Sequence, residues 1–136
     1  MAAGYSKRSL LEKLGIKDGI AISIIGAPKN YAVLLGKLPA GIKQSNKLEG
    51  PLDFLQFFCS KRSRLEDSFP KLKEALTPNG MLWVSWPKAS SGVATDLTEN
   101  VVREVGLRNG LVDVKVCAID ATWSGLKFVF RLKDRK

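Results

Sequence analysis

The sequence predicts an α/β fold in three layers, with helices on both faces of a mostly parallel sheet of about six strands and an antiparallel β-hairpin at the C-terminus. Short apolar runs alternate with segments of helical periodicity nearly throughout. Most of these runs are apolar at almost every position, which is typical of strands covered on both faces. The last two runs are separated only by a short turn that contains glycine, which indicates a hairpin. With 136 residues, 45% of them hydrophobic, the chain is expected to form one domain over residues 1–136.

The N-terminal part is expected to form a helical flank over residues 1–17, followed by the first core strand. Residues 6–14 place leucines on one face of a helix, and Gly15 is suited to end it. Residues 20–25 are almost wholly apolar, so they predict a strand that is buried on both faces.

A second helix and a weak strand are expected after the turn at residues 26–29. Pro28 suits the first position of a helix because the N–H that it lacks has no helical partner there. We expect this helix to reach residue 38. Residues 42–44 then predict a short edge strand, followed by a loop.

Residues 52–59 and 81–86 predict two further core strands with a helix between them. Ser63 and Glu66 have the spacing of a capping box, which opens a helix. Leucine and phenylalanine recur along this segment every three or four residues, and the Thr-Pro-Asn-Gly turn at residues 77–80 is expected to end the helix.

A loop of small and hydroxyl-bearing residues, 88–97, is expected to join the third core strand to the last helix. Asp96 and Glu99 can cap that helix. Residues 111–121 and 126–132 predict the hairpin, with its turn at Thr122-Trp-Ser-Gly125 and a glycine available for positive φ. A basic tail, residues 133–136, closes the chain.

The composition excludes several kinds of active site. The chain has no histidine, which excludes Ser–His and Cys–His nucleophilic pairs, imidazole metal ligands and imidazole acid–base steps. Cys59 and Cys117 lie in apolar runs typical of buried thiols, and two cysteines cannot form a cysteine-rich zinc site, so no metal site is expected. No apolar run approaches the roughly 20 residues that cross a bilayer, and no secretory signal is evident, so we expect no membrane span and a cytoplasmic location.

The net charge of +9 can attract phosphate groups through long-range electrostatics. The lysines and arginines are scattered rather than gathered into one block, and the sequence has no RNA-binding aromatic signature and no zinc-finger spacing. Solvated helix faces with a basic tail are the plain interpretation, and nucleic-acid association is an alternative.

A ligand site is expected at the carboxyl edge of the sheet. If the strands are parallel, the loops at residues 26–29, 60–62 and 88–96 all leave the sheet at that edge, and the hairpin turn reaches it too. Hydroxyl groups, a glycine and lysines in these loops suit an anionic or polar molecule, and an indole offers a face for stacking. The candidate ligand-binding residues are Lys29, Lys88, Ser90, Ser91, Gly92, Thr95 and Trp123.

Each candidate also has a structural interpretation. The loop hydroxyls can satisfy loop backbone groups, and Trp86, like Trp123, can pack in the core. Asp96 and Asp120 are acids near the predicted site, but a helix cap and a hairpin turn explain them equally well. Cys59 is a reactive thiol only if neighbouring cations lower its pKa, and burial has the opposite effect. No catalytic residue is assigned.

The element order resembles a shortened Rossmann-like methyltransferase domain. Residues 76–84, Leu-Thr-Pro-Asn-Gly-Met-Leu-Trp-Val, are similar to that family's turn into its fifth strand, and the terminal hairpin resembles its last two strands. The resemblance implies S-adenosylmethionine as a possible cofactor, and two departures disfavour it. Residues 26–29, Gly-Ala-Pro-Lys, are not a glycine-rich turn, and residues 45–47, Ser-Asn-Lys, stand where a ribose-binding acid is expected.

Longer segments resemble a small family of uncharacterised bacterial proteins, a domain of unknown function. They are residues 5–6 with 13–17, residues 86–99 and residues 114–128. This resemblance spans nearly the whole chain and implies the same fold without implying an activity.

These observations lead to three functional hypotheses. The first is a small cytosolic binding module that takes an anionic small molecule or a protein partner at the carboxyl edge of the sheet. The alternative is a divergent methyltransferase-like enzyme that uses S-adenosylmethionine. A second alternative is a basic protein associated with nucleic acid.

Overall fold

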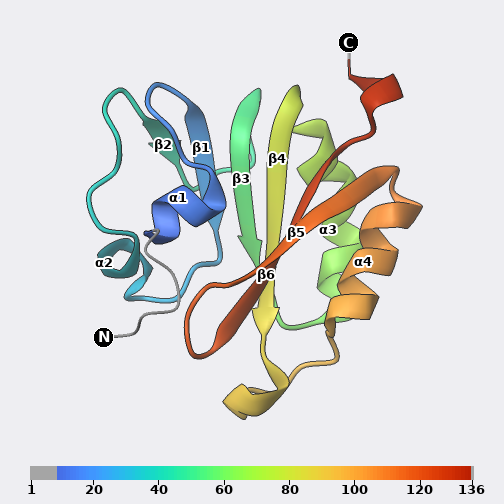
Figure 1. Ribbon diagram of the computed structural model, residues 1–136. Coiled ribbons are helices and arrows are strands. Elements are labelled where there is room, and N and C mark those ends of the chain that lie inside the picture. The colour runs from blue at the N-terminus through green and yellow to red at the C-terminus, as the bar shows by residue number, and fades with distance from the viewer. Residues whose placement is uncertain (1–8, 136) are drawn as a thin grey trace.

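The computed structural model describes residues 9–135 and contains one six-stranded sheet with helices on both faces (Figure 1). The strands follow the order β2-β1-β3-β4-β6-β5; β1 to β4 are parallel, and β6 pairs antiparallel with both β4 and β5. The predicted fold class is therefore confirmed. In chain order the elements are α1 (Leu10–Leu14), β1 (Ala21–Ile25), α2 (Tyr31–Leu35), β2 (Lys43–Ser45), β3 (Leu52–Phe58), α3 (Arg62–Glu74), β4 (Leu76–Pro87), the short 3-10 helix η1 (Ala89–Ser91), α4 (Glu99–Arg108), β5 (Leu111–Ala118), β6 (Trp123–Phe130) and the 3-10 helix η2 (Leu132–Asp134).

The sheet separates two hydrophobic cores, which explains why the central strands are apolar on both faces. In β3, Phe54 and Phe58 belong to the core on the side of α1 and α2, whereas Leu55 and Phe57 belong to the core on the side of α3 and α4. The fully buried Trp83 of β4 anchors α1, because its indole N–H donates to the carbonyl oxygen of Leu14 at 2.9 Å. Burial of apolar surface in the two layers stabilises the three-layer arrangement.

The first two helices both end at glycines, and the second is shorter than predicted. Ser9 and Glu12 form a capping box at the start of α1, and Gly15, at φ 87°, ends it as predicted. The expected start at residue 6 lies outside the described residues. The predicted second helix is present as α2, but its expected bounds, residues 28–38, are too wide, because Pro28 lies in the turn before α2 and Gly36, at φ 77°, ends the helix.

The connection from β2 to β3 crosses the sheet without a helix. Residues 46–51 pass over the α3 side of β1, where the buried hydroxyl of Ser23 donates to the carbonyl oxygen of Lys47 at 2.6 Å. Leu48 packs against the core on that side. β2 is confirmed as a short, exposed edge strand, and no helix follows it before β3.

One predicted cap and one predicted turn differ from the structure around α3. The helix begins at Arg62, so Ser63 lies within its first turn and does not cap it. The N–H of Arg62 donates instead to Asp96 of a distant loop. The predicted turn at residues 77–80 is an irregularity within β4. The pairing with β3 shifts there from Leu52–Leu76 to Phe54–Met81.

The predicted turn of the C-terminal hairpin is also wrong. The chain reverses over residues 119–122, and Asp120 Oδ1 accepts bonds from the backbone N–H groups of Thr122 and Trp123, both at 2.8 Å. Asp120 therefore stabilises the turn, as one of its two interpretations expected. Gly125 lies inside β6, where a Cβ would stand 3.1 Å from both Trp83 and Ile119, so its small size serves packing.

None of the helices within residues 9–135 has the length and apolar character that a bilayer crossing requires.

Candidate functional site

The carboxyl ends of the parallel strands bring distant segments together at one edge of the sheet. The backbone N–H of Lys88 donates to Thr122 O in the hairpin turn at 2.8 Å. The hydroxyl of Thr95 donates to Ser60 O, after β3, at 2.6 Å. The predicted convergence of the loops after β3 and β4 with the hairpin turn is thus present in the structure, where these bonds fix the loops to one another.

The turn after β1 lies directly against the end of β3. Gly26 has φ 75°, and a Cβ at this position would stand 2.8 Å from Phe58 O. Only glycine allows the backbone this approach without strain. The turn therefore closes the space directly between the ends of β1 and β3, and it directs residues 27–29 toward α2.

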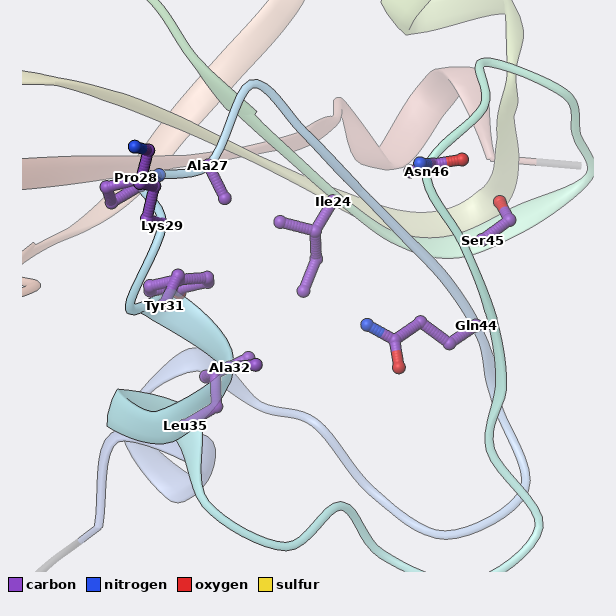
Figure 2. Close-up of a pocket in the computed structure, with 10 residues that line it drawn as sticks. All are labelled: Ile24, Ala27, Pro28, Lys29, Tyr31, Ala32, Leu35, Gln44, Ser45 and Asn46. Carbon is purple, nitrogen blue, oxygen red and sulfur yellow. The ribbon is translucent and has the colours of Figure 1, made fainter.

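A cavity of about 470 Å³ opens on the α2 side of this turn, between α2 and β2 (Figure 2). Ile24 of β1 lies between the two walls, and Figure 2 shows the Gln44 amide extending into the space from the β2 side. The volume lies in the range of small-molecule sites. The lining residues are Ile24, Ala27, Pro28, Lys29, Tyr31, Ala32, Leu35, Gln44, Ser45 and Asn46.

The two walls of the cavity differ in chemistry. On the α2 side, Tyr31 and Leu35 are buried and present ring and aliphatic surface. On the β2 side, Gln44, Ser45 and Asn46 are exposed and carry amide and hydroxyl groups. A ligand with one apolar face and several hydroxyl groups matches this division, and Lys29 adds a cation.

Tyr31 is held in place by a buried chain of hydrogen bonds. Its hydroxyl donates to Gln56 Oε1 at 2.6 Å, and Gln56 Nε2 donates to Ser85 Oγ at 3.1 Å. Its ring meets that of Phe58 edge to face, with centroids 4.9 Å apart. Burial raises the pKa of the Tyr31 hydroxyl, so this group is a neutral donor and not a proton acceptor for a ligand.

The predicted ligand-binding residues do not line a single cavity. Lys29 lines the cavity between α2 and β2, whereas Thr95 lines a smaller cavity of about 280 Å³ beside the start of α3. Neither cavity is lined by the other predicted residues, which are Lys88, Ser90, Ser91, Gly92 and Trp123.

The hydroxyl groups of the loop after β4 largely bond to nearby backbone. Ser91 Oγ donates to Lys88 O at 2.7 Å and accepts from the N–H of Val93, while Thr95 Oγ1 accepts from the N–H of Leu97. Gly92 has φ 79° and ends η1. The ring of Trp123 packs edge to face against Phe58, with centroids 5.1 Å apart. A role of this loop in ligand binding stays a prediction.

The acid, thiol and indole considered as candidates each have a structural role or a buried position. Asp96 Oδ1 accepts from the backbone N–H of Arg62 at 2.7 Å, so it caps α3 and not the helix that follows it. Burial raises the pKa of the Cys59 thiol to about 12, which leaves it protonated at neutral pH. Trp86 is buried in the core beneath α3 and α4. Cys59 and Cys117 are both free and buried.

Sequence reasoning misses the cavity residues from α2 and β2. It marks residues 45–47 only as the place of a missing acid, and it does not single out Tyr31. The sequence does contain a signal for the β2 wall of the cavity. The predicted edge strand is polar, and it follows an apolar strand and a turn that begins with glycine, which is an arrangement typical of ligand sites in α/β sheets. What the sequence does not show is that α2 is short enough to leave β2 partly uncovered.

Solved structures of S-adenosylmethionine-dependent methyltransferases have a fold similar to that of this chain. A ribosomal protein L11 methylase from Lactobacillus delbrueckii has a TM-score of 0.61 at 14% identity, covering 90% of this chain and 75% of that one. A methyltransferase from Aquifex aeolicus, described as SAM-dependent, has a TM-score of 0.61 at 12% identity, covering 88% and 86%.

A third similar structure is magnesium protoporphyrin IX methyltransferase from Synechocystis with bound S-adenosylhomocysteine, with a TM-score of 0.58 at 12% identity over 89% of this chain and 78% of that one. A scan of protein-family models and a search of curated proteins each found no match. At these identities the likeness shows the fold alone: this chain has the Rossmann-like architecture of a shortened methyltransferase domain.

Proposed function

We propose that the protein binds a small molecule of the nucleoside class that carries an acid group, in the cavity between α2 and β2. The observation that carries this proposal is the position of the cavity. The chain runs from β1 outward to β2 and then returns across β1 to β3, so the strand order reverses at β1. Open α/β sheets bind ligands near such a reversal, outside the carboxyl ends of the strands. The cavity opens at the ends of β1 and β2, beside the boundary between β1 and β3 that Gly26 closes.

The cavity offers separate contacts for each part of such a ligand. Ile24 and Leu35 offer apolar contact to a base, and Gln44 and Asn46 offer amide groups to ribose hydroxyls. The Lys29 ammonium suits a carboxylate or phosphate at the rim. The donor set favours a molecule that has a base at one end, hydroxyl groups in the middle and a carboxylate or phosphate group at the other.

S-adenosylmethionine and S-adenosylhomocysteine fit this donor set, and the fold shared with methyltransferases supports testing them first. Bound S-adenosylmethionine supplies a methyl group on a sulfonium centre. Asn46 takes the place of an acid at the end of β2, so the chain binds ribose through neutral groups. Because Gly26 closes the turn against Phe58, the ligand lies on the α2 side of the turn.

Calorimetric titration with S-adenosylmethionine, S-adenosylhomocysteine and adenosine tests the proposal. Ala32 lines the cavity, whereas its neighbour Val33 is 84% exposed. We expect Ala32→Trp to abolish binding by filling the space and Val33→Trp to leave it unchanged. Equal affinity in the two variants, or no heat from any of the three compounds with the unaltered protein, would overturn it.

The charge at the rim is tested by a second pair of variants. We expect Lys29→Ala to weaken binding of the two adenosyl amino acids about fivefold, because an exposed charge pair contributes about 1 kcal/mol. Adenosine lacks the acid group and should bind both proteins equally. Lys37→Ala removes a nearby exposed lysine that does not line the cavity, and it is the matched control.

Methyl transfer is the second candidate function, supported by the fold shared with structures described as methyltransferases. Transfer of labelled methyl groups from S-adenosylmethionine to cell extract measures it directly. Activity that Ala32→Trp abolishes supports an enzyme, whereas binding without transfer supports a binding module. Lys88→Ala in the same titrations tests whether the loop after β4 contributes to ligand binding.

A further inference from the structure

The two helices that cover one face of the sheet contribute little to the positive charge of the chain. The helices α3 and α4 together carry six basic and five acidic residues, so they contribute little to the net charge of +9. Their arginines are largely paired: Arg62 with Glu66, Arg103 with Glu99 and Asp113, and Arg108 with Glu104. Most of the excess positive charge therefore lies outside these two helices.

Two lysines face each other on the opposite side of the sheet. Lys115 of β5 and Lys127 of β6 are register partners in the antiparallel hairpin. Lys127 is also the partner of Trp83, whose indole binds the end of α1, so its side chain lies on the α1 side. Like charges directly opposite in an antiparallel pair destabilise a sheet, so this pair needs a compensating interaction.

The surroundings of the pair compensate it only in part. The Lys115 ammonium donates to the carbonyl oxygen of Lys13 at the end of α1, at 3.2 Å. This carbonyl group is uncharged, and it accepts from only one of the three N–H donors of the Lys115 ammonium. None of the ion pairs found within residues 9–135 includes Lys17, Lys115 or Lys127.

The Lys127 side chain has no hydrogen-bond or ion-pair partner among residues 9–135. It is partly buried. Partial burial, followed by the charges of Lys115 and Lys17, lowers its pKa. The Lys127 ammonium is therefore repelled electrostatically by both of these lysines, and Lys115 is its register partner.

We propose that Lys115 and Lys127 form a binding site for a phosphate group on the α1 side of the sheet. A phosphate group carries at least one negative charge and several acceptor oxygens, so it can accept hydrogen bonds from more than one ammonium group at once. The site is separate from the cavity between α2 and β2, because β6 is separated from β1 by β3 and β4.

Binding is measured with two probes, inorganic phosphate and a single-stranded DNA of uniform sequence, at two salt concentrations. We expect Lys115→Gln/Lys127→Gln to weaken binding of either bound probe at least about tenfold. The matched control, Lys71→Gln/Lys133→Gln, removes the same charge from exposed lysines on α3 and η2, outside the proposed site. It should change binding less than about twofold. Lys115→Arg/Lys127→Arg keeps the charge and should retain binding.

The two probes distinguish the sources of the phosphate. If DNA binds more tightly than inorganic phosphate and its affinity falls steeply with salt, the partner is a nucleic-acid backbone, and the double variant should reduce the salt slope by roughly 0.7 per lysine. If phosphate binds with equal affinity, the partner is a small phosphorylated molecule. Equal losses in the two charge-removing variants, or no binding of either probe by the unaltered protein at low salt, would overturn the proposal.

Discussion

At the scale of single residues, Gly26 is the position where backbone geometry determines the site. Its positive φ and its approach to Phe58 O both exclude a side chain. The sequence predicted a turn here, but it did not predict that the turn packs against the neighbouring strand, because that contact is 32 residues distant along the chain.

We expect Gly26→Ala to lower the free energy of unfolding by about 2–4 kcal/mol, from backbone strain together with the clash. Gly92→Ala is the control, since Gly92 has φ 79° but a Cβ added there would meet no other atom within 4 Å. It should cost about 1–2 kcal/mol from strain alone. Urea denaturation measures both, and equal losses would show that the clash at Phe58 is relieved.

Lys127 makes stability depend on pH. Because its pKa in the folded protein is lowered from the ordinary 10.5, folding disfavours the charged form. The penalty is present in full below the folded-state pKa, and it disappears as the pH rises through that value toward 10.5.

At pH 7 we therefore expect Lys127→Met to raise the free energy of unfolding, by less than about 1 kcal/mol because solvent screens the exposed part of the side chain. The advantage of the variant should shrink as the pH approaches 10.5. Denaturation of both proteins across this pH range measures the difference. A difference that does not change with pH would assign the effect to packing.

At the scale of elements, the ends of helices were harder to predict than their cores. The apolar periodicity of α3 was correct, because Leu65, Phe69 and Leu72 are all buried. The predicted cap of α3 was wrong, because the fold brings the carboxylate of Asp96 from another loop to the start of the helix. Sequence spacing detects a local capping box but not a cap from a distant residue.

Asp96 and Ser63 separate these two arrangements. We expect Asp96→Ala to lower the free energy of unfolding by about 1 kcal/mol, because the first N–H of α3 loses its partner. Ser63→Ala should change it by less than about 0.5 kcal/mol, as a surface substitution does. Thermal denaturation compares the two variants. A larger loss of stability for Ser63→Ala than for Asp96→Ala would support the capping box that the sequence predicted.

At the scale of the whole molecule, the sequence predicted the architecture well and the site incompletely. Alternating periodicity identified the sheet, both helical layers and the C-terminal hairpin, since these depend on burial along each element. The convergence of loops at the carboxyl edge followed from parallel strands. The cavity could not be predicted in this way. It depends on how much of β2 the short α2 leaves uncovered, and no local sequence pattern indicates that.

The spacing of the layers depends on one further contact. A Cβ at Gly106 of α4 would stand 2.0 Å from the Phe128 ring of β6. We expect Gly106→Ala to move α4 away from the sheet and to cost about 1–3 kcal/mol, despite the better helix propensity of alanine. Leu107→Ala, on the exposed side of the same helix, is the control and should cost much less. Urea denaturation compares the two variants, and an equal or smaller loss for Gly106→Ala would show that the ring adapts without moving the helix.

The five-residue length of α2 has a consequence for detecting an occupant of the cavity. A helix this short is not stable by itself, so its order depends on Tyr31 and Leu35 remaining docked on the sheet. Its amide hydrogens should therefore exchange with deuterium through local opening, well before those of the central strands. A molecule that bridges α2 and β2 holds the helix closed, so slower deuterium uptake in this segment reports occupancy directly.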